Sequence, residues 1–466
     1  MDRINNHDTI CAPATPAGGA LGIIRVTGPK AIEAVNRIFR PAKGTQLAGR
    51  KGGFATFGTI IDDENIVDEV IATPFRAPHS YTGEDSVEIS CHGSSYIISE
   101  ILRLLITKGD CRMAEPGEYT KRAFLNGKMD LSQAEAVADV IASTSKAAHD
   151  VAIKQMRGGF SRKLKELREK LLRLTSLMEL ELDFSDHEEL EFADRSELKA
   201  LCNEIENELS GLCRSFALGN AMKNGIPVAI AGETNTGKST LLNLMLNDEK
   251  AIVSDIDGTT RDIIEDTANI SGVMFRFIDT AGIRETNDKI ESIGIEKTFK
   301  AIGQASIVLL MLDASIAMFQ WSKLSDKLLP LCHDKHLIVV FNKCDLIDES
   351  HEPLLKQLLP DQMDSVFISA KEKKNIDKLQ KLLVKASSID KADNEDVIIT
   401  NLRHLDALRH ASDSIRRVSQ GLSTGTPTDL VAQDLRECIY HLSDIAGEVT
   451  TDAVLKTIFE HFCIGK

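Results

Sequence analysis

Short apolar runs separated by Gly and Pro fill the first 120 residues of the chain. Four of these runs have the composition and length of β-strands: Leu21–Val26, Phe54–Ile61, Val67–Ala72 and Ser86–Cys91. Helical stretches lie between them. The pattern therefore predicts an N-terminal α+β domain, which we place at residues 1–124.

The pattern then changes to the spacing of long helices. Asp130 with Gln133 three residues later forms a helix-start signal. A second helix is predicted over 160–182, where apolar residues recur every three or four positions: Leu164, Leu167, Leu171, Leu174, Met178 and Leu182. A third is predicted over 196–217, and the chain is again helical from about residue 397. We expect the stripe of apolar residues to lie in a helical core.

Between the helical regions, strands and helices alternate. Nearly continuous apolar strands at 227–231, 306–312 and 336–342 are typical of a parallel sheet that is covered on both faces. The economical architecture is an α/β domain over 220–389 inserted into a helical domain. Its two parts, 125–219 and 390–466, are then expected to pack together.

Composition limits the class of protein. The chain has 466 residues, 42% hydrophobic and 27% charged, which excludes a disordered or fibrous polymer. Its formal net charge of −15 argues against nonspecific coating of nucleic acid. Nine cysteines without a C-x-x-C pair indicate reduced thiols rather than a disulfide framework or a zinc site. With no leader and no membrane-spanning run, we expect a soluble cytoplasmic protein without a membrane partner.

The strongest chemical signal is the loop from Gly232 to Ser239, which reads G-x-x-x-x-G-K-S between a predicted strand and helix. Its glycines let backbone N–H groups face phosphates, and Lys238 can reach the β and γ oxygens. Ser239 can ligate Mg²⁺. The loop predicts nucleoside triphosphate binding.

Three further motifs follow predicted strands and indicate guanine. These are Asp279–Gly282 (DTAG), Asn342–Asp345 (NKCD) and Ser369–Lys371 (SAK). The carboxylate of Asp345 can accept from both N1–H and the 2-amino group of guanine, a donor pair that adenine lacks. The sequence therefore predicts a GTP hydrolase.

The segment Asp257–Asp262 lies between the first two motifs, and we assign Thr260 as a second Mg²⁺ ligand. Ras-like GTPases place a water-orienting Gln directly after D-x-x-G, but position 283 is Ile. Glu291 is the candidate for that task. The alternative for Glu291 is a solvated acid at a helix start.

These nucleotide motifs resemble the Era-like GTPase group. Other segments resemble the MnmE (TrmE) family of tRNA-modification GTPases, and the resemblance covers the whole chain. They include Gly22–Val26, Tyr81–Asp85, Cys91–Gly93, Ala114–Glu118, Arg122–Lys128 and the terminal Phe462–Lys466.

The resemblance implies a homodimer that forms a heterotetramer with an FAD-dependent partner subunit. Together they would build a (carboxymethyl)aminomethyl group at C5 of the wobble uridine in certain tRNAs. A tetrahydrofolate derivative would supply one-carbon units from the N-terminal domain. Its carried-over contacts are Arg25, Glu88, Lys128 and Lys466.

The resemblance also implies that K⁺ takes the place of an arginine finger. Its ligands would be Asn235, Ser254, Ile256 and Thr259, and the catalytic residues would be Glu291 and Lys238. The full GTP-binding set in the Ras-like G domain is Asn235, Thr236, Gly237, Lys238, Ser239, Thr240, Ser254, Asp255, Ile256, Asp257, Gly258, Thr259, Thr260, Asp279, Thr280, Ala281, Gly282, Asn342, Lys343, Cys344, Asp345, Ser369, Ala370 and Lys371.

Two alternative functions remain at this point. The GTP motifs alone equally permit a ribosome-assembly GTPase, although the chain shows no KH or RRM signature and has only 5% aromatic residues. A GTP-dependent scaffold without chemistry of its own is the other alternative. Cys463 is a lone thiol for which the sequence fixes no base, so we assign it no role.

Overall fold

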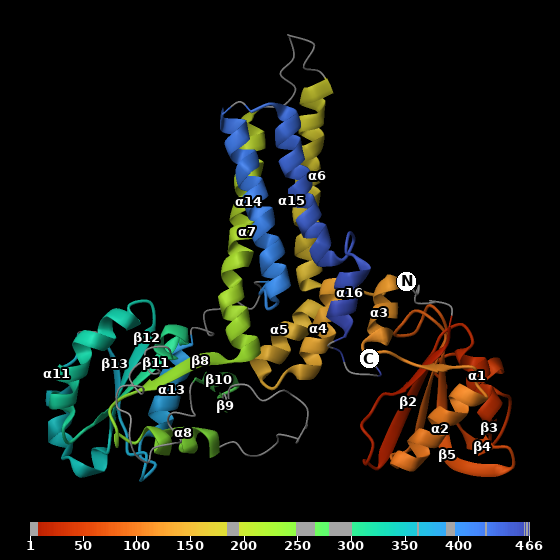
Figure 1. The fold of residues 1–466 in the computed structure, drawn as a ribbon, viewed down its shortest axis with the longest axis horizontal. Coiled ribbons are helices and arrows are strands. Elements are labelled where there is room, and N and C mark those ends of the chain that lie inside the picture. The colour runs from red at the N-terminus through yellow and green to blue at the C-terminus, as the bar shows by residue number, and fades with distance from the viewer. Residues whose placement is uncertain are drawn as a thin grey trace. The chain divides into compact units, whose positions relative to one another are not determined.

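The structure is a computed structural model, and the residues that it describes are 8–183, 195–247, 266–278, 301–360, 363–387, 397–424, 426–460, 462 and 465. Contacts within the chain divide it into two units (Figure 1). The first comprises residues 1–138, 154–205 and 413–466, and the second comprises 139–153 and 206–412.

A seven-stranded sheet forms the N-terminal part of the first unit. The strand order is β3-β4-β5-β6-β2-β1-β7, and all neighbours are antiparallel except β1 and β7. The strands are β1 (Ile10–Pro13), β2 (Leu21–Thr27), β3 (Phe39–Pro41), β4 (Thr56–Asp62), β5 (Asn65–Phe75), β6 (Ser86–His92) and β7 (Arg112–Met113). The four strands predicted from the sequence correspond to β2, β4, β5 and β6, so those predictions are confirmed.

Helices cover one face of this sheet. Figure 1 shows α1 (Ala31–Ile38) and α2 (Ser95–Thr107) on the same side, and both contact β6. The core between them contains Ile24, Val35, Ile89 and Leu104, all fully buried. A short 3₁₀ turn (Leu47–Gly49) and α3 (Glu118–Leu125) complete this part. The alternating pattern of β2 results from this one-sided covering.

The long helices follow the predicted capping and packing signals. The Gln133 N–H donates to Asp130 Oδ1 at 2.9 Å, and the Asp130 N–H donates to Gln133 Oε1 at 3.0 Å. This reciprocal pair caps α4 (Leu131–Ala142), as predicted. α6 (Gly159–Asp183) packs on α15 (Thr428–Ala446), and the stripe from Leu164 to Met178 is buried.

The other helices of the chain are α5 (Lys146–Met156), α7 (Arg195–Asn224), α14 (Leu402–Thr424) and α16 (Asp452–Phe459). The predicted end of α7 at residue 217 is wrong, because the helix continues to Asn224. Gly219 lies inside it, where an added Cβ would overlap the carbonyl oxygen of Ile399. This glycine therefore permits a close approach of two backbones and does not end the helix. No helix in the described ranges is long and apolar enough to cross a bilayer.

A six-stranded, mostly parallel sheet forms the centre of the second unit. Its order is β13-β12-β11-β8-β10-β9, and only β9 is antiparallel to its neighbour. The strands are β8 (Ile226–Ala231), β9 (Asp266–Ile270), β10 (Val273–Phe277), β11 (Ile307–Asp313), β12 (His336–Asn342) and β13 (Asp364–Phe367). The sequence did not predict β9.

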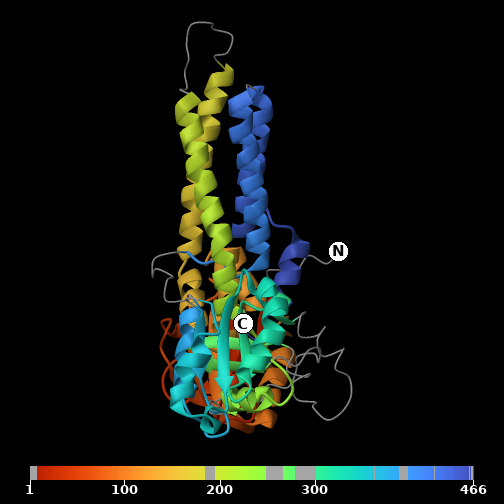
Figure 2. The same cartoon turned by 90° about the vertical axis from the view of Figure 1, so that its left-hand side faces the viewer.

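Helices cover both faces of this sheet. α8 (Lys238–Asn247) and α13 (Ile376–Ala386) pack on one face, with Leu309 and Met311 of β11 beneath them. α11 (Ala317–Leu328) packs on the other face, against Leu310 and Leu312. Figure 2 shows α11 and α13 on opposite sides of the sheet. The shorter elements are α12 (Glu352–Lys356) and the 3₁₀ turns Leu329–Cys332, Cys344–Leu346 and Glu349–His351.

α7 runs almost directly into the second sheet, because Gly225 alone separates Asn224 from Ile226. Gly225 has a φ of 83°, which an L side chain rarely adopts. An added Cβ would lie 3.0 Å from Met274 Cγ. The predicted combination of an α+β part, long helices and a mostly parallel sheet is therefore confirmed.

Candidate functional site

The predicted phosphate loop connects the end of β8 to the start of α8. Its backbone enters the left-handed region at Asn235 (φ 63°) and Gly237 (φ 97°), and Gly232 has a φ of 149°. An added Cβ on Gly232 would lie 2.5 Å from the carbonyl oxygen of Met311. On Gly237 it would overlap the side-chain amide of Asn342. Both glycines are therefore needed for the close packing of this loop.

Lys238, Ser239 and Thr240 form the first turn of α8, where backbone N–H groups and the helix dipole favour an anion. Lys238 Nζ donates to the carbonyl oxygens of Gly232 at 2.9 Å and Glu233 at 2.7 Å. Thr236 Oγ1 also donates to the Glu233 carbonyl, at 2.9 Å. Burial lowers the pKa of Lys238, and the charge of Glu233 works in the opposite direction. The lysine thus spans the loop that the sequence predicts to hold phosphates.

The NKCD motif begins with the last residue of β12, and its asparagine contacts two other motifs. Asn342 Nδ2 donates to the Thr236 carbonyl oxygen at 2.7 Å, and the Ala370 N–H donates to Asn342 Oδ1 at 3.0 Å. Asn342 is only 3% exposed. The buried amide therefore brings together the phosphate loop, NKCD and SAK at the carboxyl edge of the parallel sheet, where open α/β sheets bind ligands.

The remaining residues of NKCD and SAK differ in exposure. Lys343 has a φ of 64°, and Cys344 is buried in the following 3₁₀ turn. Asp345 and Lys371 are exposed, whereas Ser369 is fully buried and its Oγ accepts from the Glu372 N–H at 3.2 Å. The arrangement presents one carboxylate and one ammonium group to solvent beside the Asn342 contact.

Four residues beside the phosphate loop were not predicted from the sequence. Glu233, in the loop itself, pairs with Lys323 and Gln320 of α11. Asp313, at the end of β11, accepts from Lys343 Nζ at 2.7 Å. The motif leaves position 233 unspecified, and no pattern in the sequence connects it with a helix about 90 residues later. The strand-end position of Asp313 was the one available signal.

Several predicted site residues lie outside the residues that the structure describes. They are Ser254, Asp255, Ile256, Asp257, Gly258, Thr259, Thr260, Asp279, Thr280, Ala281, Gly282, Glu291, Lys466 and also Cys463.

The predicted folate contacts lie in the N-terminal part of the chain. Arg25 and Glu88 face each other on β2 and β6, and Arg25 Nη2 donates to Glu88 Oε1 at 2.7 Å. The Arg25 guanidinium also lies 5.7 Å from the ring centre of Tyr81, within range of a cation–π contact. Its Nη1 donates to the Gly465 carbonyl oxygen at 3.2 Å. The structure therefore places the second-to-last residue of the chain beside Arg25.

Lys128 contacts the loop that contains Tyr81. Its Nζ donates to the Pro78 carbonyl oxygen at 2.9 Å, and Gly83 lies against its side chain. Tyr81 in turn pairs its hydroxyl with Thr120 Oγ1 at 2.9 Å, and burial raises the pKa of Tyr81. Arg25 and Lys128 therefore both touch the 78–83 loop.

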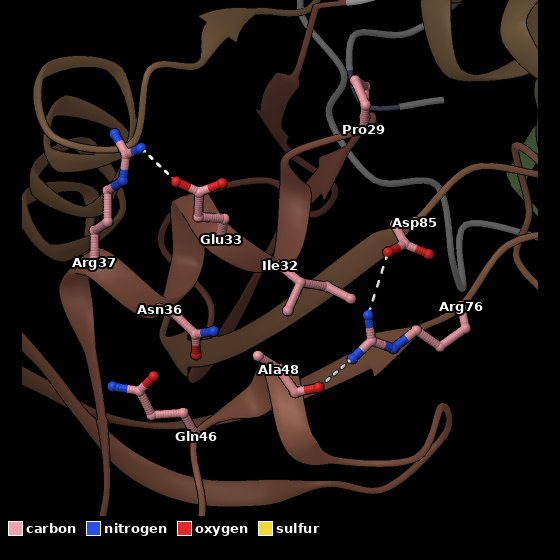
Figure 3. A pocket seen from close by; sticks show the side chains of 9 residues that line it. All are labelled: Pro29, Ile32, Glu33, Asn36, Arg37, Gln46, Ala48, Arg76 and Asp85. Atoms are coloured by element: carbon pink, nitrogen blue, oxygen red, sulfur yellow. Dashed lines mark hydrogen bonds and ion pairs between the residues drawn. The ribbon is translucent and has the colours of Figure 1, made fainter.

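A hollow of about 570 Å³ elsewhere in the N-terminal part contains none of the predicted residues (Figure 3). Two arginines line it, but each is already paired. Arg37 donates to Glu33 at 2.6 Å, and Arg76 contacts Asp85 at 3.3 Å and the Ala48 carbonyl at 2.7 Å. Because these charges balance within the protein, we do not regard this hollow as the candidate site.

Comparison with known proteins covers nearly the whole chain. The family model "GTP-binding protein TrmE N-terminus" matches residues 9–128, and the model "MnmE helical domain" matches residues 131–463. A protein named tRNA modification GTPase MnmE from Bacteroides thetaiotaomicron is 60% identical over 466 residues, which cover 99% of this chain and 100% of that protein. The one from Flavobacterium psychrophilum is 49% identical and covers 99% of each.

Among solved structures, the chain is similar to an Aquifex aeolicus Era variant bound to GDP.AlF4-. That similarity has 28% identity and a TM-score of 0.28, and covers 40% of this chain and 65% of the other. The family assignment rests on the sequence comparisons. On those comparisons, the chain belongs to the MnmE family of tRNA modification GTPases.

Proposed function

We propose that this chain is a K⁺-dependent GTP hydrolase that works on tRNA with an FAD-dependent partner subunit. The pair installs a (carboxymethyl)aminomethyl group at C5 of the wobble uridine of certain tRNAs. The one-carbon unit comes from a tetrahydrofolate derivative. The active assembly is a heterotetramer built on a homodimer of this chain, and it works in the cytoplasm. The contact of Asn342 with Thr236 and Ala370 supports the nucleotide site most directly.

The proposed division of labour follows four segments. Residues 1–124 bind folate and dimerise, 125–219 and 390–466 form the helical domain, and 220–389 form the G domain. The family-model match to residues 9–128 supports a separate N-terminal domain. The packing of α6 on α15 supports a helical domain made from both sides of the insertion.

In the G domain, we assign phosphate binding to the 232–237 loop and to Lys238. Ser239 and Thr260 are assigned to Mg²⁺, which neutralises charge on the β and γ phosphates. Ser239 fits this role because a hydroxyl in the first turn of α8, next to Lys238, is a hard oxygen ligand. The exposed carboxylate of Asp345 accepts from guanine. Glu291 orients the attacking water.

The proposed K⁺ ligands are Asn235, Ser254, Ile256 and Thr259. Asn235 fits because asparagine tolerates the left-handed conformation found there, and its amide oxygen is a hard ligand. When bound, K⁺ offsets charge that develops between the β and γ phosphates. The other three ligands lie outside the described residues.

Folate binding is assigned to Arg25, Glu88, Lys128 and Lys466. Glu88 uses only Oε1 for Arg25, and within the part of the chain that the structure describes its Oε2 has no protein hydrogen bond. That oxygen can accept from N–H groups of a pterin ring. Cationic Lys128 suits the carboxylates of a glutamate tail. The carboxylate of Glu88 and the ammonium group of Lys128 therefore fit the donors and acceptors of a folate.

The test is mass spectrometry of wobble-uridine nucleosides in tRNA from cells that lack this gene. The cells are complemented with the wild type or with Lys238→Ala. We expect the C5 modification to be lost and to be restored only by the wild type. An unchanged nucleoside profile in the deletion strain would overturn the proposal and favour ribosome assembly or scaffolding.

A further inference from the structure

An acidic residue lies inside the predicted phosphate loop, where it works against anion binding. Glu233 directly follows Gly232, and its carbonyl oxygen accepts from Lys238 Nζ at 2.7 Å. A carboxylate on a loop that binds phosphates raises the electrostatic cost of binding them unless its charge is balanced. Its side chain is partly buried, with 23% of it exposed, so solvent screens it only in part.

α11 supplies that balance with two side chains, one for each oxygen of the carboxylate. Lys323 Nζ lies 2.7 Å from Glu233 Oε1, and Gln320 Nε2 donates to Glu233 Oε2 at 3.1 Å. Residues three apart lie on the same side of a helix, so both reach the loop together. The hydrogen bond from Lys323 lowers the pKa of Glu233, burial opposes this, and the bond from Gln320 adds to it.

Gln320 has a second contact that fixes its orientation. It is 2% exposed, and its Oε1 accepts from the Asp313 N–H at 2.8 Å. The side-chain amide accepts from this N–H through its oxygen and donates to the carboxylate through its nitrogen at the same time. The backbone at the end of β11 therefore fixes the Gln320 amide, and that amide in turn fixes the carboxylate of Glu233.

The same strand end holds the lysine of NKCD. Asp313 Oδ2 accepts from Lys343 Nζ at 2.7 Å, while Oδ1 accepts from Ser315 Oγ at 2.7 Å. Asp313 thus connects the guanine-binding motif with Gln320 through one residue. A single polar network extends from Lys343 to the phosphate loop.

We propose that Lys323 and Gln320 are positioning residues for guanine nucleotides. They hold the carboxylate of Glu233 against α11 and balance its charge, which allows the phosphate loop to accept an anion. Neither residue touches the nucleotide in this scheme, because both act through Glu233. The inference rests on the proposed GTP site.

The first test is a double-mutant cycle on the full chain, with N-methylanthraniloyl-GDP as the fluorescent probe. Lys323→Met is expected to weaken binding about three- to tenfold in the wild-type background. In the Glu233→Gln background, the same substitution is expected to cost less than about twofold, because no charge remains to be balanced. Lys327→Met removes an exposed charge from the same helix and serves as the matched control.

Turnover separates positioning from a general structural effect. With Lys323→Met, the KM for GTP is expected to rise by more than kcat falls. An equal loss of affinity in both backgrounds, or no loss in either, would overturn the inference. Lys238→Ala reports on the GTP site itself. If it binds the probe like the wild type, the site proposal fails; if it loses binding while Lys323→Met has no effect, only this inference fails.

Gln320 is tested by exchanging the amide and the carboxylate. Gln320→Glu places two carboxylates against each other and is expected to weaken probe binding. The double variant Glu233→Gln with Gln320→Glu recreates an amide–carboxylate pair in reverse and is expected to recover at least half of the loss in binding free energy. Absence of recovery would contradict the role of Gln320.

Discussion

The side chain of Asn342 donates to the carbonyl oxygen of Thr236 at 2.7 Å, across 106 positions of sequence. Both residues are almost fully buried. The contact ties the end of β12 to the phosphate loop, and its partner contact with Ala370 extends it to SAK. The shape of the loop after β8 therefore depends on a side chain from β12, which β11 separates from β8 in the sheet.

Asn342→Ala is expected to weaken guanine-nucleotide binding at least tenfold. The substitution leaves the Thr236 carbonyl and the Ala370 N–H without this partner, and each unpaired buried group costs about 1–3 kcal/mol. Denaturant unfolding should show a lower free energy of unfolding by a similar amount. Asn342→Asp keeps the acceptor for the Ala370 N–H but loses the donor to the Thr236 carbonyl. Its nucleotide affinity should therefore lie between those of the wild type and Asn342→Ala. Wild-type affinity in Asn342→Ala would refute this account.

Asp345→Asn is expected to change the preferred base. The new amide offers an oxygen to N1–H but meets the 2-amino group of guanine with one acceptor fewer, so GTP affinity should fall about a hundredfold. Xanthosine triphosphate carries a 2-oxo group and should be preferred by the variant. Competition binding with GTP and xanthosine triphosphate measures this change in base preference. Retained preference for GTP would exclude Asp345 as the residue that reads the base.

Replacement of KCl by NaCl at equal ionic strength is expected to lower GTP turnover at least tenfold, because the proposed cation offsets charge in the transition state. Asn235→Ala should show low turnover in both salts. Asn243→Ala, on the exposed side of α8, is the matched control and should keep the potassium response. Turnover that does not depend on the cation would refute the Asn235 assignment.

Glu88→Gln is expected to weaken binding of tetrahydrofolate about tenfold, since it removes the charge that balances Arg25 and that we propose accepts from the pterin. Isothermal titration calorimetry on the full chain measures the change. Glu69→Gln removes an exposed carboxylate from the neighbouring strand β5 and should bind like the wild type. Equal affinity in the two variants would count against the folate assignment.

A buried carboxylate in α3 should make the chain sensitive to acid. Burial tends to raise the pKa of Glu118, but hydrogen bonds from Arg112, the Glu115 N–H and Arg122 hold it below its ordinary value of 4.5. Because the folded-state pKa is the lower one, its stabilisation is complete above about pH 4.5 and is lost as the pH falls through the folded-state pKa.

Glu118→Gln should therefore lower the free energy of unfolding at neutral pH by about 3–5 kcal/mol, because two arginines lose a buried partner. It should also flatten the acid dependence. Denaturant unfolding followed by circular dichroism across the acidic range measures both. Exposed Glu115→Gln is the control, since only its backbone contacts Glu118. An unchanged acid slope would contradict the role of Glu118.

The parts of the fold with strong local patterns were predictable. The β8–loop–α8 unit combines an apolar strand, two constrained glycines and a helix start, and the structure has it where the sequence indicates. β9 was missed because only Ala268 and Ile270 of its residues are buried, so an edge strand of this composition looks like a loop.

The contacts between motifs were not predictable. The sequence identifies Asn342 as part of a guanine motif. The register of the sheet, which places Asn342 opposite Asp313, brings its side chain within reach of the phosphate loop and of SAK. α11 was missed because Met318 and Phe319, at its start, are exposed apolar residues that blur the amphipathic pattern. With α11 unrecognised, nothing in the sequence connects Glu233 with Lys323.

A single residue between α7 and β8 connects a long helix closely with the strand that leads into the phosphate loop. Met274 and Arg276 pack closely around Gly225. This packing leaves the connection between α7 and β8 less conformational freedom than a flexible linker has. β8 in turn ends at Ala231, one residue before Gly232, so six strand residues and one glycine connect α7 with the phosphate loop. A displacement of the last turn of α7 is therefore expected to change the position of the phosphate loop.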